Sequence, residues 1–122
     1  MEVHRSIDLL PRFRNAVVTI GTFDGVHLGH QKIIDAVLNE AKTVDGDSVL
    51  ITFEPHPRKI VDPSLNLQLI NTLDEKIALL QKKGIDHLVI VPFTPSFAEQ
   101  SPEAYIKDFL MRRFHPHTII IG

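Results

Sequence analysis

Hydrophobic residues gather in four short, nearly continuous runs along the chain. These runs are rich in β-branched residues and cover residues 16–20, 48–53, 87–92 and 118–121. Strands buried on both faces of a parallel sheet show such continuous runs, whereas strands with one face in water alternate between apolar and polar residues. The pattern therefore predicts four strands of a parallel sheet.

Amphipathic stretches between these runs predict helices. The first covers about residues 27–42, and one helical face collects five apolar side chains: Ile33, Ile34, Val37, Leu38 and Ala41. The second begins at the capping box Thr72-Leu73-Asp74-Glu75 and ends at Gly84. Its inward positions are Leu73, Ile77 and Leu80.

A third helix is predicted after Ser101-Pro102, a serine N-cap followed by a proline at the first helical position. Its periodicity turns four residues inward, namely Tyr105, Ile106, Phe109 and Leu110. The element order is then β-α-β-α-β-α-β. This order predicts an α/β fold whose parallel strands are joined by right-handed crossovers.

Two segments stand outside this alternation. Residues 3–14 are ambiguous, because Ile7, Leu9 and Leu10 fit either an edge strand or a packed arm. Residues 54–71 contain three prolines, so they cannot form an ordinary helix. Loops of this length in compact domains are usually functional.

The composition suits one folded domain. The chain has 122 residues, of which 43% are hydrophobic, and a formal net charge of −2. It has no basic stripe of the kind that binds nucleic acids, and no cysteine for a disulfide scaffold or a cysteine zinc site. It also lacks a bilayer-length apolar run and a signal-peptide core, so we expect a cytoplasmic protein that contacts neither nucleic acid nor membrane.

The residues most suited to binding or catalysis follow the first predicted strand. The sequence there is Gly21-Thr22-Phe23-Asp24-Gly25-Val26-His27-Leu28-Gly29-His30. Such a turn from a buried strand into a helix is where open α/β sheets bind phosphates. His27 and His30 are three residues apart and share one helical face, and Gly29 between them leaves room for a substrate group.

Several roles stay open for the two histidines. They can donate hydrogen bonds to a phosphoryl transition state, bind a metal, or act as acid and base. A metal site is disfavoured, because the pattern is not His-Glu-x-x-His and no acidic ligand follows closely. The sequence matches neither a Walker P-loop nor the three glycines of a dinucleotide fingerprint, and no serine has an activating arrangement for nucleophilic catalysis.

The carboxyl ends of parallel strands lie at one edge of a sheet, so the other strand ends are predicted to meet this turn. They are residues 53–59, the tripeptide Phe93-Thr94-Pro95, and Gly122. We therefore expect a ligand site along this edge.

For other polar and aromatic residues, turn, packing or surface roles are considered beside ligand contacts. Asp24 bonds either its own turn backbone or a ligand. Phe93 and Phe97 are expected to pack in the core or the loop rather than to stack on a ligand. We expect four histidines to be surface or strand-edge residues that belong to no functional cluster: His4, His87, His115 and His117.

Two motifs together resemble a known family. The stretch from Gly21 to His30 resembles the His-x-Gly-His signature of the nucleotidyltransferase superfamily. Combined with Phe53-Glu54-Pro55-His56-Pro57-Arg58, it resembles the FAD synthetase module of the prokaryotic bifunctional riboflavin kinase/FMN adenylyltransferases. Thr72-Leu73-Asp74-Glu75-Lys76 and Phe93-Thr94-Pro95-Ser96-Phe97 also fit, so the resemblance runs from about residue 5 to residue 122.

The resemblance implies a Rossmann-like nucleotidyltransferase fold, with helices on both faces of the sheet, and a Mg²⁺-assisted reaction of ATP with FMN that yields FAD and pyrophosphate. His27 and His30 would contact the ATP phosphates. The nucleotide pocket would be formed by Gly21, Thr22, Phe23, Asp24, Gly29 and Gly122. The flavin side would be formed by Phe53, Pro55, His56, Pro57 and Arg58. No metal bound by protein side chains is implied.

The family pattern continues beyond the glycine that matches Gly122, with an Asp-containing loop, a Ser/Thr-rich segment that ends in Arg, and a riboflavin kinase domain. We therefore expect residues 1–122 to be a truncated FMN adenylyltransferase domain that is incomplete at its C-terminal end, with the kinase domain absent. Two alternatives remain: a cytidylyl- or adenylyltransferase with another phosphorylated acceptor, and a fragment that only binds nucleotide or flavin.

Overall fold

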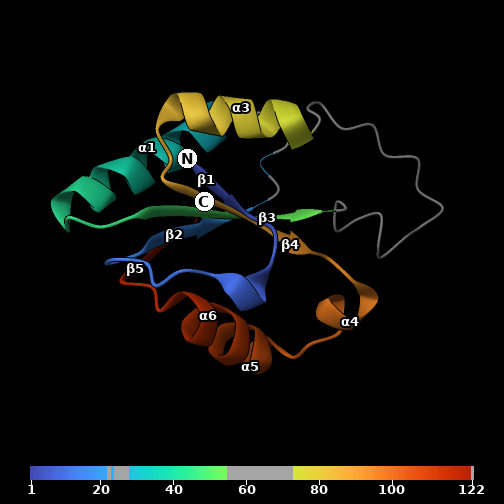
Figure 1. The fold of residues 1–122 in the computed structure, drawn as a ribbon. Coiled ribbons are helices and arrows are strands. Elements are labelled where there is room, and N and C mark those ends of the chain that lie inside the picture. The colour runs from blue at the N-terminus through green and yellow to red at the C-terminus, as the bar shows by residue number, and fades with distance from the viewer. Residues whose placement is uncertain (22, 24–27, 55–72, 122) are drawn as a thin grey trace.

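All strands in the described part of the chain lie in one parallel sheet. The computed structural model describes residues 1–21, 23, 28–54 and 73–121. The strands, in the spatial order β1-β4-β3-β2-β5, are β1 Glu2–His4, β2 Val17–Ile20, β3 Ser48–Glu54, β4 His87–Pro92 and β5 Thr118–Ile120 (Figure 1). Every pair of neighbours is parallel. The four predicted strands and the α/β class are confirmed.

The N-terminal segment combines the two structures that its sequence left open. The edge strand is β1, which pairs with β4 so that Glu2 lies opposite His87. The following residues form a 3₁₀ helix, η1 (Ile7–Leu9), and not a strand. Ile7 packs against the core, whereas 82% of Leu9 is exposed. The segment around η1 is therefore the packed arm.

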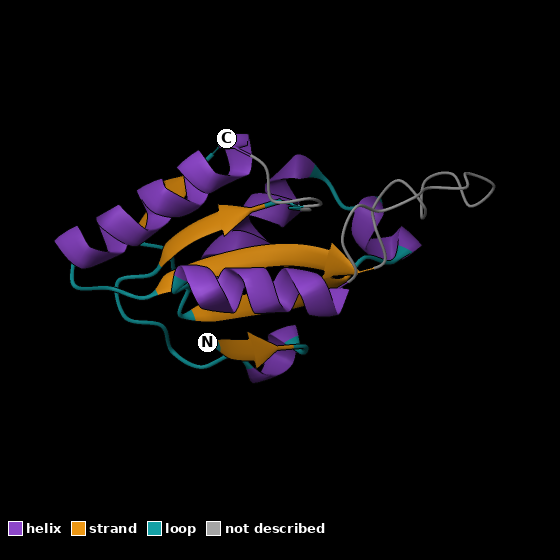
Figure 2. Ribbon diagram, turned by 90° about the horizontal axis from the view of Figure 1, so that it is seen from above, coloured by secondary structure: helices purple, strands orange, loops and turns teal. Residues whose placement is uncertain are grey.

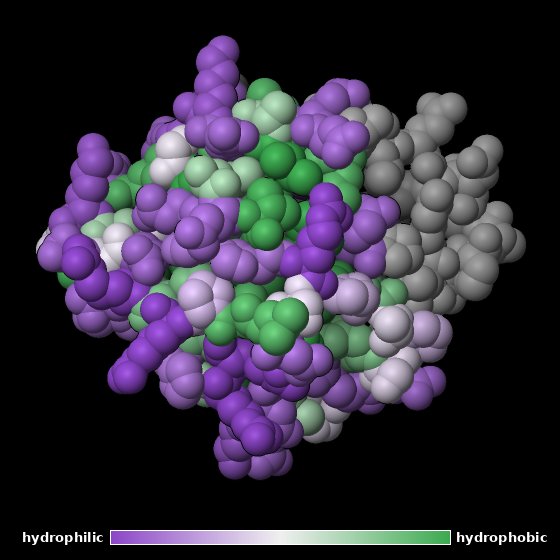
Figure 3. Space-filling view, in the orientation of Figure 1, coloured by the Kyte–Doolittle hydropathy of each residue, from purple (hydrophilic) through white to green (hydrophobic). Residues whose placement is uncertain are grey.

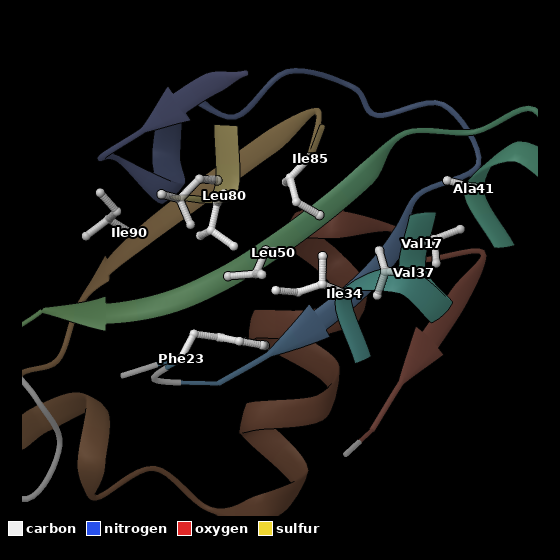
Figure 4. Close-up of a cluster of buried hydrophobic side chains, with 10 residues drawn as sticks. Val17, Phe23, Ile34, Val37, Ala41, Leu50, Leu80, Ile85 and Ile90 are labelled. Carbon is white, nitrogen blue, oxygen red and sulfur yellow. The ribbon is translucent and has the colours of Figure 1, made fainter. Parts of the chain in front are cut away.

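Helices cover both faces of the sheet (Figures 1 and 2). On one face lie α1 (Leu28–Thr43) and α3 (Leu73–Lys83). Alternate strand residues point to this face, and Val17 and Leu50 meet Ile34, Val37 and Leu80 there (Figure 4). The opposite face is covered by the helical segment 102–114 and the arm around η1. A sheet covered in this way has continuously apolar strands.

The two helices on the first face follow their predicted patterns. In α1, Ile34, Val37 and Ala41 are buried, and Ile33 and Leu38 pack partly buried beside them. Their spacing of three and four residues keeps them on one helical face.

The predicted end of α3 is also confirmed. Gly84 has a φ of 97°, a left-handed conformation that glycine adopts without strain. Its N–H donates to the carbonyl oxygen of Gln81 over 3.1 Å. Thr72, the first residue of the predicted capping box, lies outside the described residues.

The third predicted helix begins as expected. A short helix α4 (Pro95–Ala98) precedes it. Ser101 then caps α5 (Pro102–Ala104), because its Oγ accepts a hydrogen bond from the backbone N–H of Ala104 over 3.1 Å. The predicted serine N-cap and N-terminal proline are confirmed.

The middle of this helix differs from the prediction. The backbone widens into a π-helix, η2 (Tyr105–Met111), before a last turn, α6 (Arg112–Phe114). Phe109 and Leu110 are buried as predicted, but 53% of Ile106 is exposed, so its predicted inward position is wrong. In a π-helix the hydrogen bonds run from i to i+5, so the 3.6-residue period that grouped Ile106 with them no longer holds.

The surface mixes charged and apolar side chains, as the face in Figure 3 shows. Among the helices of the described ranges, none has the length and apolarity needed to cross a membrane.

Candidate functional site

The order in which successive strands join the sheet reverses at β2. The chain leaves β2 through α1 and enters β3 on one side, whereas β5 pairs with β2 on the other side. Loops that leave two neighbouring strands in opposite directions open a crevice at the carboxyl ends of those strands, which is where open α/β sheets bind ligands. The crevice predicted by this topology lies beside Gly21.

The turn after β2 is built by the close packing of Gly21 and Phe23. The N–H of Gly21 donates to the carbonyl of Ile51 over 3.0 Å and so extends the sheet by one residue. Phe23 has a φ of 49° and is 3% exposed, with its ring in the core cluster on the α1 side. A Cβ on Gly21 would lie 2.8 Å from Cε2 of that ring. Gly21 is therefore required by packing as well as by its place at the sheet edge.

Replacing Gly21 by Ala should destabilise the protein by about 1–3 kcal/mol, the usual cost of forcing a methyl group into a packed site. The ring of Phe23 is buried and cannot move away without disturbing the core. Urea unfolding of the variant measures the loss. Gly84→Ala should also destabilise the protein, but through backbone strain alone, because a Cβ there meets nothing within 4 Å and the residue has a φ of 97°. A Gly21→Ala variant as stable as the parent would contradict this packing.

His30 lies in the first turns of α1, close to the turn after β2. Its ring centroid is 5.1 Å from that of Phe23, at an interplanar angle of 53°. The side chain is half-buried, and its Nδ1 is fully buried. This contact joins the beginning of α1 to the end of β2. A phosphate at this helix N-terminus would meet backbone N–H groups and the positive end of the helix dipole.

The other residues predicted for the nucleotide side are only partly described. Gly29 lies in the first turn of α1. Thr22, Asp24, His27 and Gly122 lie outside the described residues.

Three aromatic rings meet at the carboxyl ends of β3 and β4. The ring centroids of Phe53 and Phe93 are 5.2 Å apart, and Phe97 lies 5.6 Å from Phe53 and 5.5 Å from Phe93. Phe97 also contacts Phe109 in the core, with centroids 5.1 Å apart. The packing interpretation of Phe93 and Phe97 is confirmed. The other predicted flavin-side residues, Pro55, His56, Pro57 and Arg58, lie outside the described residues.

Comparison with known proteins decides the family. Residues 10–122 match the family model described as FAD synthetase. The chain belongs to the FAD synthetase family. The resemblance found in the motifs around His30 and Phe53 is therefore confirmed over almost the whole chain.

Curated relatives of the family are longer than this chain. The bifunctional riboflavin kinase/FMN adenylyltransferase of Buchnera aphidicola subsp. Schizaphis graminum is 36% identical over 123 residues, which cover 100% of this chain and 39% of that protein. A protein named FAD synthetase from Listeria monocytogenes is 34% identical over 108 residues, which cover 88% of this chain and 44% of that protein. The chain thus spans less than half the length of these two relatives.

A solved structure shares the fold. The crystal structure of a macrolide-efflux protein from Streptococcus pneumoniae has a TM-score of 0.85 to this chain and covers 98% of it, against 40% of its own chain. The identity is 21%, so this likeness supports the architecture and no activity. The predicted Rossmann-like fold of the FAD synthetase family is confirmed.

A groove at the same sheet edge was not predicted. It lies between the ends of β1 and β4, and its polar lining includes Arg5, Ser6, Thr94 and Gln100. The Nε2 of Gln100 is buried and has no hydrogen-bond partner in the part of the chain that the structure describes. Thr94 belongs to the predicted edge segment Phe93-Thr94-Pro95, but Arg5, Ser6 and Gln100 belong to no predicted motif, and Arg5 and Ser6 reach the groove only because β1 joins the sheet.

The prediction that His4 and His87 belong to no cluster is wrong. Nε2 of His4 lies 3.0 Å from Nδ1 of His87, because β1 pairs with the start of β4. Burial and then the charge of His87 lower the pKa of His4 below 6.5, while Glu2 partly opposes them. The remaining two histidines, His115 and His117, are exposed as predicted.

The lowered pKa of His4 predicts an acid-sensitive fold. Below pH 6.5 the unfolded chain binds a proton at His4, whereas the folded chain does so only at a lower pH. The contribution of His4 to the free energy of unfolding is therefore fully present above pH 6.5, and it is lost as the pH falls toward the lowered pKa of the folded state. Calorimetry in EDTA should show the melting temperature falling over this range. His4→Asn should flatten the slope, and the exposed control His117→Asn should not. Equal slopes in all three proteins would contradict the effect.

Proposed function

We propose that the chain performs adenylyl transfer from ATP to FMN, which gives FAD and pyrophosphate. The observation that carries this proposal is the family match over residues 10–122. The motif that we expect to bind phosphates begins at Gly21, directly after β2. The relatives' printed names include both FAD synthetase and FMN adenylyltransferase. A phosphate oxygen of FMN attacks the α-phosphorus of ATP, and the bond to the β-phosphate oxygen breaks as pyrophosphate leaves.

The proposed work of the chain is positioning and charge stabilisation, because this transfer needs no covalent enzyme intermediate. His27 and His30 donate hydrogen bonds to the phosphates of ATP as charge develops on the transferred group. The backbone of residues 21–24, with Gly29 and Gly122, lines the nucleotide pocket. The buried ring of Phe23 supports this assignment, because the side chain lies in the core and only the backbone of this residue remains for contact with a ligand.

We assign the flavin side to Phe53, Pro55, His56, Pro57 and Arg58. Phe53 belongs to the aromatic group with Phe93 and Phe97, and it is only partly buried. Apolar and aromatic side chains are the usual lining of sites for flat ligands. A basic side chain such as Arg58 suits the phosphate of FMN.

Mg²⁺ enters this proposal as part of the ATP substrate. The residues assigned to the phosphates are histidines and backbone N–H groups, which suit anions, whereas Mg²⁺ prefers oxygen ligands. The ion would neutralise phosphate charge during the transfer. We also propose that a longer protein containing this chain phosphorylates riboflavin to FMN, as the names of the bifunctional relatives indicate, and that both steps occur in the cytoplasm.

The test is an assay of FAD formation from ATP and FMN by the natural protein that contains this chain, with chromatography of the flavins and measurement of pyrophosphate. Equal amounts of FAD and pyrophosphate are expected. Calorimetry with ATP and FMN provides the second measurement. Binding without turnover would replace the proposal by a binding module, and turnover only with CTP or with another phosphorylated acceptor would replace the proposed substrates.

A further inference from the structure

Three potential metal ligands meet where β1 joins β4. Glu2 and His4 are two residues apart on β1, so their side chains share one face of the sheet. His87 begins β4 and lies directly opposite Glu2 in the parallel register. The pairing of an N-terminal strand with the fourth strand thus brings two imidazoles and a carboxylate together, although the histidines are 83 residues apart in the sequence.

The ligand atoms are spaced as a small metal ion requires. The Nε2 of His4 and the Nδ1 of His87 are 3.0 Å apart, and Oε2 of Glu2 lies 3.7 Å from the first and 3.6 Å from the second. In a tetrahedral zinc site with bonds of about 2.0–2.1 Å, neighbouring ligand atoms are about 3.3 Å apart. A point equidistant from the three atoms of this cluster lies about 2.0 Å from each.

The surroundings of His87 also resemble those of a metal ligand. Its second nitrogen, Nε2, faces Oδ2 of Asp47 at 3.8 Å. That oxygen is held in place, because it accepts a hydrogen bond from the backbone N–H of Arg14 over 2.8 Å. Histidines that bind metals usually direct their other ring nitrogen toward a carboxylate or a carbonyl, which fixes the ring orientation and the tautomer.

Burial divides the cluster into a fixed part and an open part. Only 14% of the His4 side chain and 13% of the His87 side chain are exposed, whereas 71% of the Glu2 side chain is exposed. Phe13 packs against both rings, with centroids 6.0 Å from His4 and 4.8 Å from His87. The two nitrogen ligands are thus preorganised, and an ion can enter from the solvent side beside Glu2.

We propose that Glu2, His4 and His87 bind a zinc ion that fastens β1 to the edge of the sheet. Two imidazole nitrogens and one carboxylate oxygen are a ligand set that zinc favours, and water can supply the fourth ligand. The cluster lies at the amino end of β4, away from the carboxyl edge that carries the predicted ligand site. The proposal is therefore independent of the proposed function.

Zinc binding should stabilise the fold, because β1 has three residues, pairs with β4 alone among the described strands, and would gain a further link to it through the ion. Unfolding separates the two strands and destroys the site, so an ion that binds only the folded chain raises its stability. At a zinc concentration of about 100 times the dissociation constant, the melting temperature should rise by roughly 8–15 °C.

The experiment uses tag-free protein that has been treated with EDTA, dialysed and titrated with ZnCl₂. Titration calorimetry should show one equivalent of zinc bound, and scanning calorimetry should show the rise in melting temperature. Co²⁺ should give the visible absorption of a tetrahedral site. His87→Gln and Glu2→Gln should abolish or strongly weaken this binding. Asp47→Asn should weaken it, since it removes the negative charge that faces Nε2 of His87 at 3.8 Å.

His117→Gln is the matched control, because it removes an exposed histidine outside the cluster, and it should bind zinc like the parent protein. If His87→Gln fails to fold, Glu2→Gln decides the outcome, because most of its side chain is in solvent. Absence of stoichiometric binding to the parent protein overturns the proposal. Undiminished binding to Glu2→Gln and to any folded His87→Gln protein also overturns it, because the ion would then be held elsewhere.

Discussion

Replacing His30 by Ala should lower kcat for FAD formation by about 10²–10³-fold, the scale expected when one preorganised donor to a transition state is lost. This corresponds to about 2.7–4 kcal/mol of transition-state stabilisation. His30 lies in the first turns of α1 against Phe23, which holds the ring at the end of β2. The loss should appear in kcat more than in KM, because the donor is proposed to act chiefly as charge develops.

Steady-state kinetics with ATP and FMN measure the effect in the natural protein that contains this chain. His117→Ala is the matched control, since that histidine is exposed and lies far along the sequence from the phosphate turn. If the protein also phosphorylates riboflavin, that rate should barely change in the His30→Ala variant. An unaltered kcat for FAD formation would remove His30 from the transition state, and an equal fall in both activities would indicate damage to the fold.

Replacing Phe109 by Ala should destabilise the protein by about 3–5 kcal/mol, the usual cost of removing a buried phenyl ring. Phe109 is 3% exposed and lies at the centre of an aromatic group. Its centroid is 5.1 Å from that of Phe97, 5.4 Å from Tyr105 and 5.5 Å from Phe114. A domain with a total stability of about 5–15 kcal/mol would lose a large part of it.

Ile106→Ala is the control for this experiment, because it lies in the same π-helix but is 53% exposed. Its cost should stay within about 0.5 kcal/mol, as for most surface substitutions. Guanidinium unfolding of the two variants measures the difference. A continuous α-helix would place Ile106 inward beside Phe109, so comparable losses in the two variants would contradict the π-helical winding.

Phe109 also links the core to the predicted ligand edge. It contacts Phe97, which contacts Phe53 at the end of β3. The aromatic group therefore connects the carboxyl edge of the sheet to the core, and Phe53 is held in place through Phe97 and Phe109. Phe93 and Phe97 therefore pack against one another, as the sequence predicted, although they follow a strand at the edge where a ligand site is expected.

The described elements around the candidate site could be predicted from local sequence. The connection from β2 to α1 was recognisable because a buried strand, three glycines and two histidines follow one another within fifteen residues. The meeting of strand ends followed from parallel topology alone. The groove with Gln100 and Arg5 was not recognisable, because its residues come from segments that share no motif and meet only after β1 has paired with β4.

The sequence by itself determined four of the five described strands and the helices on the α1 side, because hydrophobic period, capping residues and glycine placement act over a few neighbouring residues. It also predicted a phosphate-binding turn after β2. Tertiary structure decided the features that depend on distant pairing. The register of β1 against β4 brought His4 to His87, and packing on the second face selected the π-helix that turned Ile106 outward. Neither leaves a local signal, since strand register and helix winding are settled by the side chains that they bury against other segments.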